Sequence, residues 1–123
     1  MANTVVWFDI PTLDFDRAVK FYSDIMGTPV SIDESMGMKM GLFPMEDEGN
    51  GGAIIPPSDD AKPGNSGTRI YLNCEGQLDA VIGRVPQAGG EVIAPKVPLG
   101  QEMGFIAYIK DTEGNVLGLH SSS

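Results

Sequence analysis

The chain has 123 residues, of which 41% are hydrophobic and 20% charged, as expected for one globular domain with its own core. A net charge of −9 argues against a nucleic acid partner, which would need clustered lysine and arginine residues. No apolar run is long enough to cross a membrane, the first residues lack a secretion-signal pattern, and the lone Cys74 cannot form an internal disulfide, so we expect a cytoplasmic protein without a membrane partner.

The first half of the chain predicts a strand, a helix and three more strands. Alternating apolar residues predict the first strand at 5–10, and apolar residues at helical spacing predict a helix at 16–26. Asp14 is suited to cap the start of this helix, and Gly27 to end it in a left-handed conformation. The three shorter strands are expected at 30–33, 38–43 and 52–55, with turns that include residues 46–51.

The second half predicts the same order of elements. Residues 56–67 are rich in Pro, Gly, Ser and Asp, which favours a linker that crosses the surface. After this linker we expect a strand at 68–74 and a helix at 77–85, which Pro86 should weaken at its end. The remaining strands are expected at 91–94, 104–110 and 116–120, with a hairpin turn at 111–115.

The two halves also repeat in sequence, at an offset of 62 residues. Ala18 falls on Ala80 and Gly27 on Gly89 in this alignment. We therefore expect an α+β fold in which two βαβββ modules, at about 1–57 and 67–123, form one domain over residues 1–123. Two such units bury a face that neither buries alone, and they leave a groove between them for a ligand.

Strand alternation divides the side chains between a helix-facing side and a groove-facing side. The residues expected to face the helices are Phe8, Ile10, Ile70, Leu72, Leu117 and Leu119. The candidate ligand-binding residues on the opposite face are Trp7, Asp9, Arg69, Tyr71, Asn73 and His120. This face is unusually polar for a buried surface, which is typical of a wet groove.

Each candidate also has a structural interpretation. Trp7 and Tyr71 either stack on a planar ligand or cation, or pack in the core. Asp9 and Arg69 either pair with each other, or Arg69 holds a carboxylate or phosphate of the ligand. His120 either contacts a ligand or is a bystander near the end of the sequence, and the second interpretation is favoured.

Two further features are interpreted as structural. Met36, Met38, Met40 and Met45 would suit an adaptable binding surface, but filling of an irregular strand or a dimer contact is preferred. Cys74 alternates with the helix-facing residues, which favours a buried and unreactive thiol.

Six segments in this order resemble the vicinal oxygen chelate superfamily, which includes glyoxalase I, the bleomycin-resistance proteins and the extradiol dioxygenases. The segments are Asp-Phe-Asp-Arg-Ala-Val-Lys-Phe-Tyr (14–22), Gly-Gly-Ala-Ile-Ile (51–55), Gly-Thr-Arg-Ile-Tyr-Leu-Asn (67–73), Gln-Ala-Gly-Gly-Glu-Val-Ile (87–93), Gly-Phe-Ile-Ala-Tyr-Ile-Lys-Asp (104–111) and Glu-Gly-Asn-Val-Leu-Gly-Leu (113–119). The resemblance covers nearly the whole chain and is greatest to the short, glyoxalase-like bacterial members. It implies paired βαβββ modules in a curved eight-stranded mixed sheet around a cavity.

The resemblance also implies four positions at which metal-dependent relatives carry His, Glu or Gln ligands. In this chain they read Trp7, Gly52 (or Ala53), Arg69 (or Thr68) and Gly118. Indole, guanidinium and glycine do not ligate a zinc-, nickel- or iron-type ion. We therefore expect no metal, no other cofactor and no catalytic residue at these positions.

The function expected from the resemblance is the binding of a small organic molecule in the groove without a catalytic metal, by a homodimer. The acidic charge suits a cationic ligand, whereas Arg69 favours an anionic group on it. The alternatives are a metal-dependent lyase or isomerase of the glyoxalase type with ligands displaced to residues such as Asp9 and His120, and a dimerising partner-binding module whose groove is filled.

Overall fold

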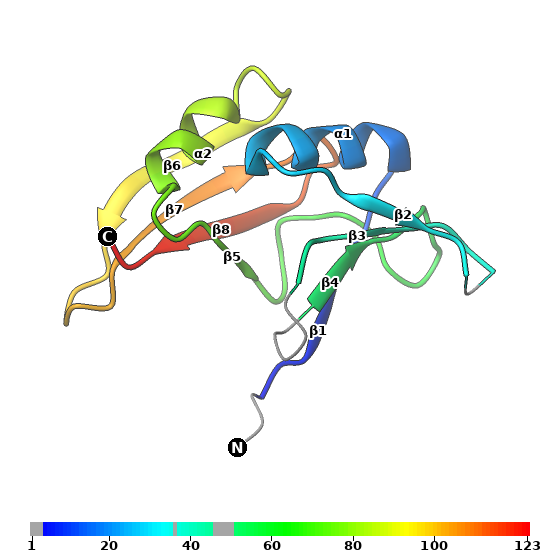
Figure 1. Cartoon of the computed structure of the whole chain (residues 1–123), viewed down its shortest axis with the longest axis horizontal. Coiled ribbons are helices and arrows are strands. Elements are labelled where there is room, and N and C mark those ends of the chain that lie inside the picture. Colours follow the sequence, from blue (N-terminus) through cyan, green and yellow to red (C-terminus); the bar gives the residue numbers. More distant parts are fainter. Residues whose placement is uncertain (1–3, 36, 46–50) are drawn as a thin grey trace.

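The computed structural model describes residues 4–35, 37–45 and 51–123 (Figure 1). The elements in chain order are β1 (Trp7–Ile10), α1 (Phe15–Met26), β2 (Ser31–Asp33), β3 (Met40–Leu42), β4 (Gly51–Ile54), β5 (Tyr71–Asn73), α2 (Leu78–Arg84), β6 (Glu91–Pro98), β7 (Phe105–Lys110) and β8 (Val116–Ser121). Within the described ranges, none of the helices combines the length and the apolar character needed to span a membrane.

The strands form two four-stranded mixed sheets, one from each half of the chain. The strand orders are β1-β4-β3-β2 and β5-β8-β7-β6, and in each sheet the first and last strands of the half pair in parallel. This confirms the predicted α+β fold with two βαβββ modules. The eight strands lie in two separate sheets, because the ladders found among the described residues all join strands of the same half.

The predicted elements are all present, with different ends. β6 continues to Pro98, four residues beyond its predicted end, through two register shifts against β7. β5 is shorter than predicted and begins at Tyr71. Met36 lies outside the described residues. The predicted turn at 46–51 also lies outside them, except for its last residue.

Local sequence signals explain where α1 begins and ends. The Asp14 side chain accepts a hydrogen bond from the backbone N–H of Arg17 at 3.1 Å, as an N-cap does. Gly27 has a φ of +69° and ends the helix in the left-handed region, which costs glycine little. α2 has no side-chain cap at Gln77 and is shorter, ending at Arg84 before Pro86.

Both helices lie on the same side of the sheets and contact each other, and the core lies between helices and sheets (Figure 1). The helix-facing residues are as predicted: Ile10, Leu72, Leu117 and Leu119 belong to the buried cluster, and Phe8 and Ile70 pack against it. Cys74 is buried in the same cluster, as expected. Among the described residues, no helix lies on the opposite side of either sheet (Figure 1).

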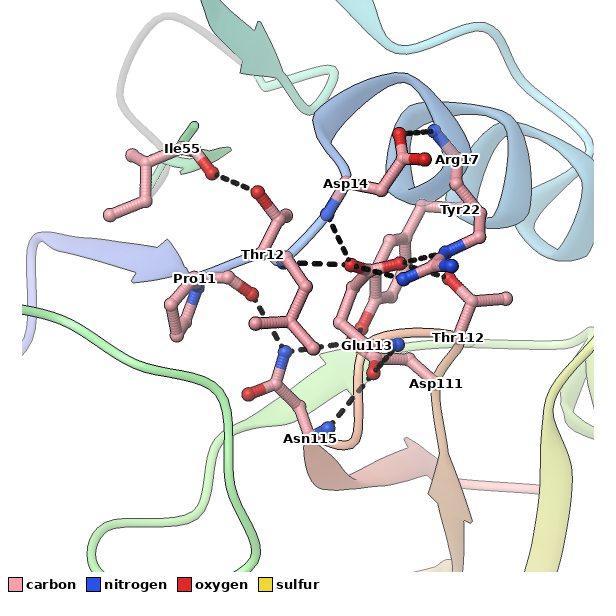
Figure 2. A network of polar contacts seen from close by, with 11 residues as sticks. Pro11, Thr12, Asp14, Arg17, Tyr22, Ile55, Asp111, Thr112, Glu113 and Asn115 are labelled. Atoms are coloured by element: carbon pink, nitrogen blue, oxygen red, sulfur yellow. Dashed lines mark hydrogen bonds and ion pairs between the residues drawn. The ribbon is translucent and has the colours of Figure 1, made fainter. Parts of the chain in front are cut away.

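A buried polar network attaches the β7–β8 turn of the second module to the start of α1 (Figure 2). The Glu113 carboxylate accepts hydrogen bonds from the backbone N–H groups of Leu13 and Asp14 at 2.8 and 2.7 Å. It also accepts bonds from Arg17 Nε and Nη2 at 2.7 and 3.0 Å. Burial alone raises the pKa of Glu113, but hydrogen bonds from Arg17, the Asp14 N–H and Thr112 outweigh it and hold this pKa at about 2.

Asp111 forms the second half of the same network. It accepts hydrogen bonds from the Tyr22 hydroxyl at 2.6 Å and from the backbone N–H groups of Glu113 and Asn115. Burial, together with the negative charge of Asp111, raises the pKa of Tyr22 well above its usual value. The Asn115 amide in turn donates to the Pro11 carbonyl at 2.9 Å, so this turn is anchored to the first module at several points.

Candidate functional site

A groove with a volume of about 710 Å³ opens beside β1, on the side of the first sheet that carries no helix. Its apolar lining comes from Trp7, Met38, Met40, Ile55, Pro56 and Pro57, and its polar lining from Asp9, Ser58 and Asp60. All of these residues precede residue 61. The repeat in the sequence predicts a groove between the two modules; this groove instead belongs to the first module and the segment that follows it.

Trp7 is the largest side chain of the groove, and its orientation is fixed from two sides. Its indole N–H donates a hydrogen bond to Asp9 Oδ1 at 3.0 Å. Its ring lies over Gly51 of the parallel strand β4, where a β-carbon would come within 2.8 Å of the ring. Trp7 keeps 41% of its surface exposed, so the residue is not enclosed by the core. Trp7 is therefore a groove residue that lies outside the core, so the core-packing interpretation does not hold, and stacking on a ligand stays a prediction.

The groove carries negative charge. Asp9 and Asp60 both line it, and within the described part of the chain neither carboxylate lies within ion-pair distance of a lysine or arginine. Asp9 interacts with Trp7, and Asp60 with Ser58. An aromatic face beside unneutralised carboxylates is an environment that attracts organic cations.

A second set of predicted residues lies on the other sheet. The hydroxyl groups of Tyr71 in β5 and Tyr108 in β7 are 2.9 Å apart, and the Arg69 guanidinium lies 4.4 Å from the centroid of the Tyr108 ring. The hydrogen bond between the two hydroxyl groups, together with Arg69, lowers the pKa of Tyr108, and the same bond raises the pKa of Tyr71. Arg69 therefore lies over the Tyr108 ring, and the Asp9–Arg69 ion pair considered from the sequence is not formed.

The last two predicted residues make local contacts. Asn73 Oδ1 accepts a hydrogen bond from the backbone N–H of Glu75 at 2.9 Å. His120 Nε2 lies 2.7 Å from the carbonyl oxygen of Met103 in the β6–β7 connection. The six predicted residues thus separate into Trp7 with Asp9 on one sheet and the remaining four on the other.

Several residues of these two sites are missing from the sequence prediction or have another role in it. The sequence favours Met38 and Met40 as filling and Pro56 and Pro57 as linker, yet all four line the groove. Tyr108 is not among the predicted site residues. Its position in the predicted strand at 104–110, however, assigns it to the same face of the sheet as Tyr71. Alternation along that strand is the signal that could have found it.

The residues at the four family metal positions do not fit a metal ion. The Phe8 ring covers Gly52, where a β-carbon would lie 2.2 Å from it, and the Tyr71 ring covers Gly118 at 2.3 Å. Trp7 and Arg69 supply no lone pair to a metal. Within residues 4–35, 37–45 and 51–123, no group of three His, Cys, Asp or Glu side chains is placed to hold an ion.

The sequence matches one family model, that of the glyoxalase/bleomycin resistance protein/dioxygenase superfamily, over residues 4–119. The chain belongs to this superfamily. A glyoxylase-like domain-containing protein from Didymella fabae is 30% identical over 117 residues, which cover 87% of this chain and 84% of that protein. The putative glyoxylase CFP32 from Mycobacterium bovis is 28% identical over 120 residues; these cover 95% of this chain but 45% of CFP32, so the chain spans less than half of that relative.

Solved structures share the fold of this superfamily member. A glyoxalase/bleomycin resistance protein from Albidiferax ferrireducens has a TM-score of 0.76 at 17% identity, covering 97% of this chain and 98% of its own. The antibiotic binding protein TnmS3 from Streptomyces has a TM-score of 0.70 at 22% identity, covering 99% and 98%. At these identities the likeness establishes the fold alone.

Proposed function

We propose that the protein binds a small organic molecule with a cationic group in the Trp7 groove, without a catalytic metal. The observation that carries this proposal is the exposed Trp7 indole, held by Asp9 at the wall of an open groove. The volume of about 710 Å³ lies in the range typical of sites for drug-sized molecules.

The chemistry of the lining favours a cation. An indole face attracts a cation through its quadrupole, and the nearby Asp9 and Asp60 carboxylates add direct charge attraction. Methionines at positions 38 and 40 add a polarisable, adaptable wall. The net charge of −9 raises the local concentration of cations around the whole molecule. A structurally similar protein, TnmS3, is described as antibiotic binding, which agrees with a ligand-binding role for the fold.

The two alternative functions have less support. An isomerase with a displaced metal would need Asp9 and His120 at one ion, but they lie on different sheets, and each already has a polar contact of its own. A partner-binding module predicts a filled groove, whereas the groove of the single chain is open.

We also infer a homodimer and a cytoplasmic location. Large apolar side chains remain exposed on both sheets, including Ile32 in β2 and Ile93 and Val97 in β6, and a second copy is the partner that would cover them. The lone, buried Cys74 agrees with a compartment in which disulfides are not needed. Light scattering coupled to size exclusion tests the dimer, and a monomer at all concentrations would overturn it.

Trp7 gives a direct test of ligand binding because it is the only tryptophan in the sequence. We would titrate the protein with 1-methylquinolinium and follow Trp7 fluorescence, with the shape-matched anion 2-naphthoate as a comparison. We expect saturable quenching by the cation and weaker binding of the anion. Asp9→Asn should weaken cation binding about fivefold, which corresponds to a cation contact of ~1 kcal/mol.

Asp24→Asn is the matched control variant, because Asp24 is an acidic residue of α1 that pairs with Lys20 outside the groove. It changes the net charge equally and should leave binding unchanged. Quenching that never saturates, or that is equal for the cation and the anion, would overturn the proposal. A second test asks whether the protein binds a metal. Untagged protein is incubated with nickel, zinc and manganese and dialysed, and its metal content is measured by elemental analysis. Stoichiometric retention of metal would overturn the proposal that binding needs no catalytic metal.

A further inference from the structure

Arg69, Tyr71 and Tyr108 form a polar cluster on the second sheet, which we call the tyrosine–arginine cluster. It lies on β5, β7 and the residues that lead into β5, whereas every lining residue of the Trp7 groove precedes residue 61. The proposed function makes no use of this cluster, so a role for it stands or falls separately from that function.

A glycine explains how the two tyrosines reach each other. Strands β5, β8 and β7 lie side by side (Figure 1), and in their register Gly118 of β8 is the neighbour of both Tyr71 and Tyr108. A β-carbon at Gly118 would be 2.3 Å from the Tyr71 ring. Because this position has no side chain, the two rings meet across the middle strand, with centroids 6.0 Å apart and hydroxyl groups 2.9 Å apart.

The cluster has hydrogen-bond donors that remain available to a ligand. One phenol donates to the other, so one O–H proton of the pair remains available. The Arg69 guanidinium lies over the Tyr108 ring and has no carboxylate within ion-pair distance among the described residues. A guanidinium that lies over an aromatic ring can still direct N–H groups to a bidentate contact with a ligand. Tyr71 is 47% exposed, so a small molecule can reach the site.

We propose that the tyrosine–arginine cluster is a second binding site, selective for the oxyanion of a small organic acid or phosphate. Arg69 supplies charge and a planar pair of donors, and the phenol pair, which meets across β8, supplies a further O–H donor. The lowered pKa of Tyr108 agrees with this assignment, because it reports that negative charge at this point is stabilised by the same two neighbours.

The site also explains why the charge signals in the sequence disagree. From the sequence, the acidic charge and the arginine were expected to act on one ligand with groups of both signs. In the structure they lie on different sheets, so the protein can bind a cation in the first module and an oxyanion in the second. A single zwitterionic ligand is then unnecessary.

The experiment follows the tyrosine ¹³Cζ and arginine ¹⁵Nε resonances of labelled protein during titration with inorganic phosphate and, separately, acetate at constant ionic strength. We expect saturable shifts of Tyr108 and Arg69, and comparison of the two titrations shows whether phosphate or carboxylate is preferred. Arg69→Gln should weaken binding about tenfold or more, as expected for the loss of a charge-assisted bidentate contact. Tyr108→Phe should weaken it less, and Arg69→Lys should restore part of it.

Lys20→Gln is the control for Arg69→Gln, since it removes one positive charge from the exposed surface of α1. Equal losses in the two variants would indicate a general charge effect and overturn the proposal. Absence of saturable shifts with both phosphate and acetate would also overturn it. The proposal would also be overturned if Arg69→Gln converted a dimer to a monomer and left phosphate and acetate binding unchanged. Arg69 would then be a subunit contact.

Discussion

The Arg17 guanidinium meets the Glu113 carboxylate through two hydrogen bonds, although 96 residues separate them in the chain. The same carboxylate accepts the backbone N–H groups of Leu13 and Asp14 at the start of α1. At the other end of α1, Nη1 of Arg84 donates to the Ile25 carbonyl at 3.0 Å. The second module thus places an anion at the N-terminus of α1 and a cation at its C-terminus, in agreement with the helix dipole. The two modules are joined through both ends of one helix.

Glu113→Gln should destabilise the protein and flatten its response to acid. The variant loses the charge-assisted bonds to Arg17 and replaces an acceptor by a donor near two backbone N–H groups, at a cost of about 2–3 kcal/mol. The pKa of Glu113 is about 2 in the folded protein against an ordinary value of 4.5. A depressed pKa contributes stability that is present above pH 4.5 and is lost as pH falls from there toward 2.

Urea unfolding at a series of pH values measures this contribution. The free energy of unfolding of the unmodified protein should fall more steeply below pH 4.5 than that of Glu113→Gln, so the two curves converge in acid. Asp24→Asn, which alters an exposed i,i+4 pair with Lys20, should shift stability only slightly. Parallel curves for the unmodified protein and Glu113→Gln would contradict the role given to this carboxylate.

Arg84→Met tests the contact at the other end of α1. Methionine keeps an unbranched apolar stem but loses the hydrogen bond to the Ile25 carbonyl and the positive charge near the C-terminus of the helix. We expect a loss of about 1–2 kcal/mol in the free energy of unfolding. Arg84→Lys, which retains the charge, should lose less. A result in which methionine and lysine are equally tolerated would show that the charge makes no contribution.

Cys74 should resist thiol reagents while the protein is folded. It is buried in the core, and burial raises the pKa of its thiol to about 11, so very little thiolate exists at neutral pH. Labelling with an aromatic disulfide reagent should be slow in buffer and fast in urea. Because this is the only cysteine in the sequence, the signal belongs to one residue. Native-state labelling at the rate of a free thiol would mean that the strand carrying Cys74 opens readily.

Much of the fold could be predicted because it depends on local signals. Alternation placed Leu72, Leu117 and Leu119 on the helix side, and Asp14 and Gly27 marked the ends of α1. The contacts between the modules could not be predicted, because residues 96 apart carry no local signal of their pairing. The turn at 111–115 was predicted, but its second role as the anchor of α1 is evident only in three dimensions.

The candidate site could be predicted only in part, for a similar reason. Alternation identified which residues share a face of a sheet, and it correctly placed Trp7 and Asp9 together. It could not show that the candidate residues separate between the two sheets, since that depends on how the modules pack. Pro56 and Pro57 looked like a linker by composition, yet the course of the chain brings them to the groove wall.

Gly118 is the residue on which the arrangement of the two tyrosines depends, and Gly118→Ala should disrupt it. The new β-carbon would lie 2.3 Å from the Tyr71 ring, so the ring must move. Overpacking of this kind costs about 1–3 kcal/mol. Displacement of Tyr71 removes the main contact that lowers the pKa of Tyr108, so this pKa should rise toward its usual value near 10. Urea unfolding and the pH titration of the tyrosine ¹³Cζ resonances measure the two effects.

Two further variants separate this steric effect from a general intolerance of alanine in place of glycine. Gly83 lies in α2, and a β-carbon added there would have nothing within 4 Å, so Gly83→Ala should stabilise the protein by about 0.5–1 kcal/mol through helix propensity. In a Tyr71→Ala background the obstacle to a β-carbon at Gly118 is gone, and Gly118→Ala should then cost little. If Gly118→Ala lowered the free energy of unfolding equally with and without Tyr71, a clash with the Tyr71 ring would not be the cause of the loss. The close approach of the two tyrosines would then not depend on Gly118.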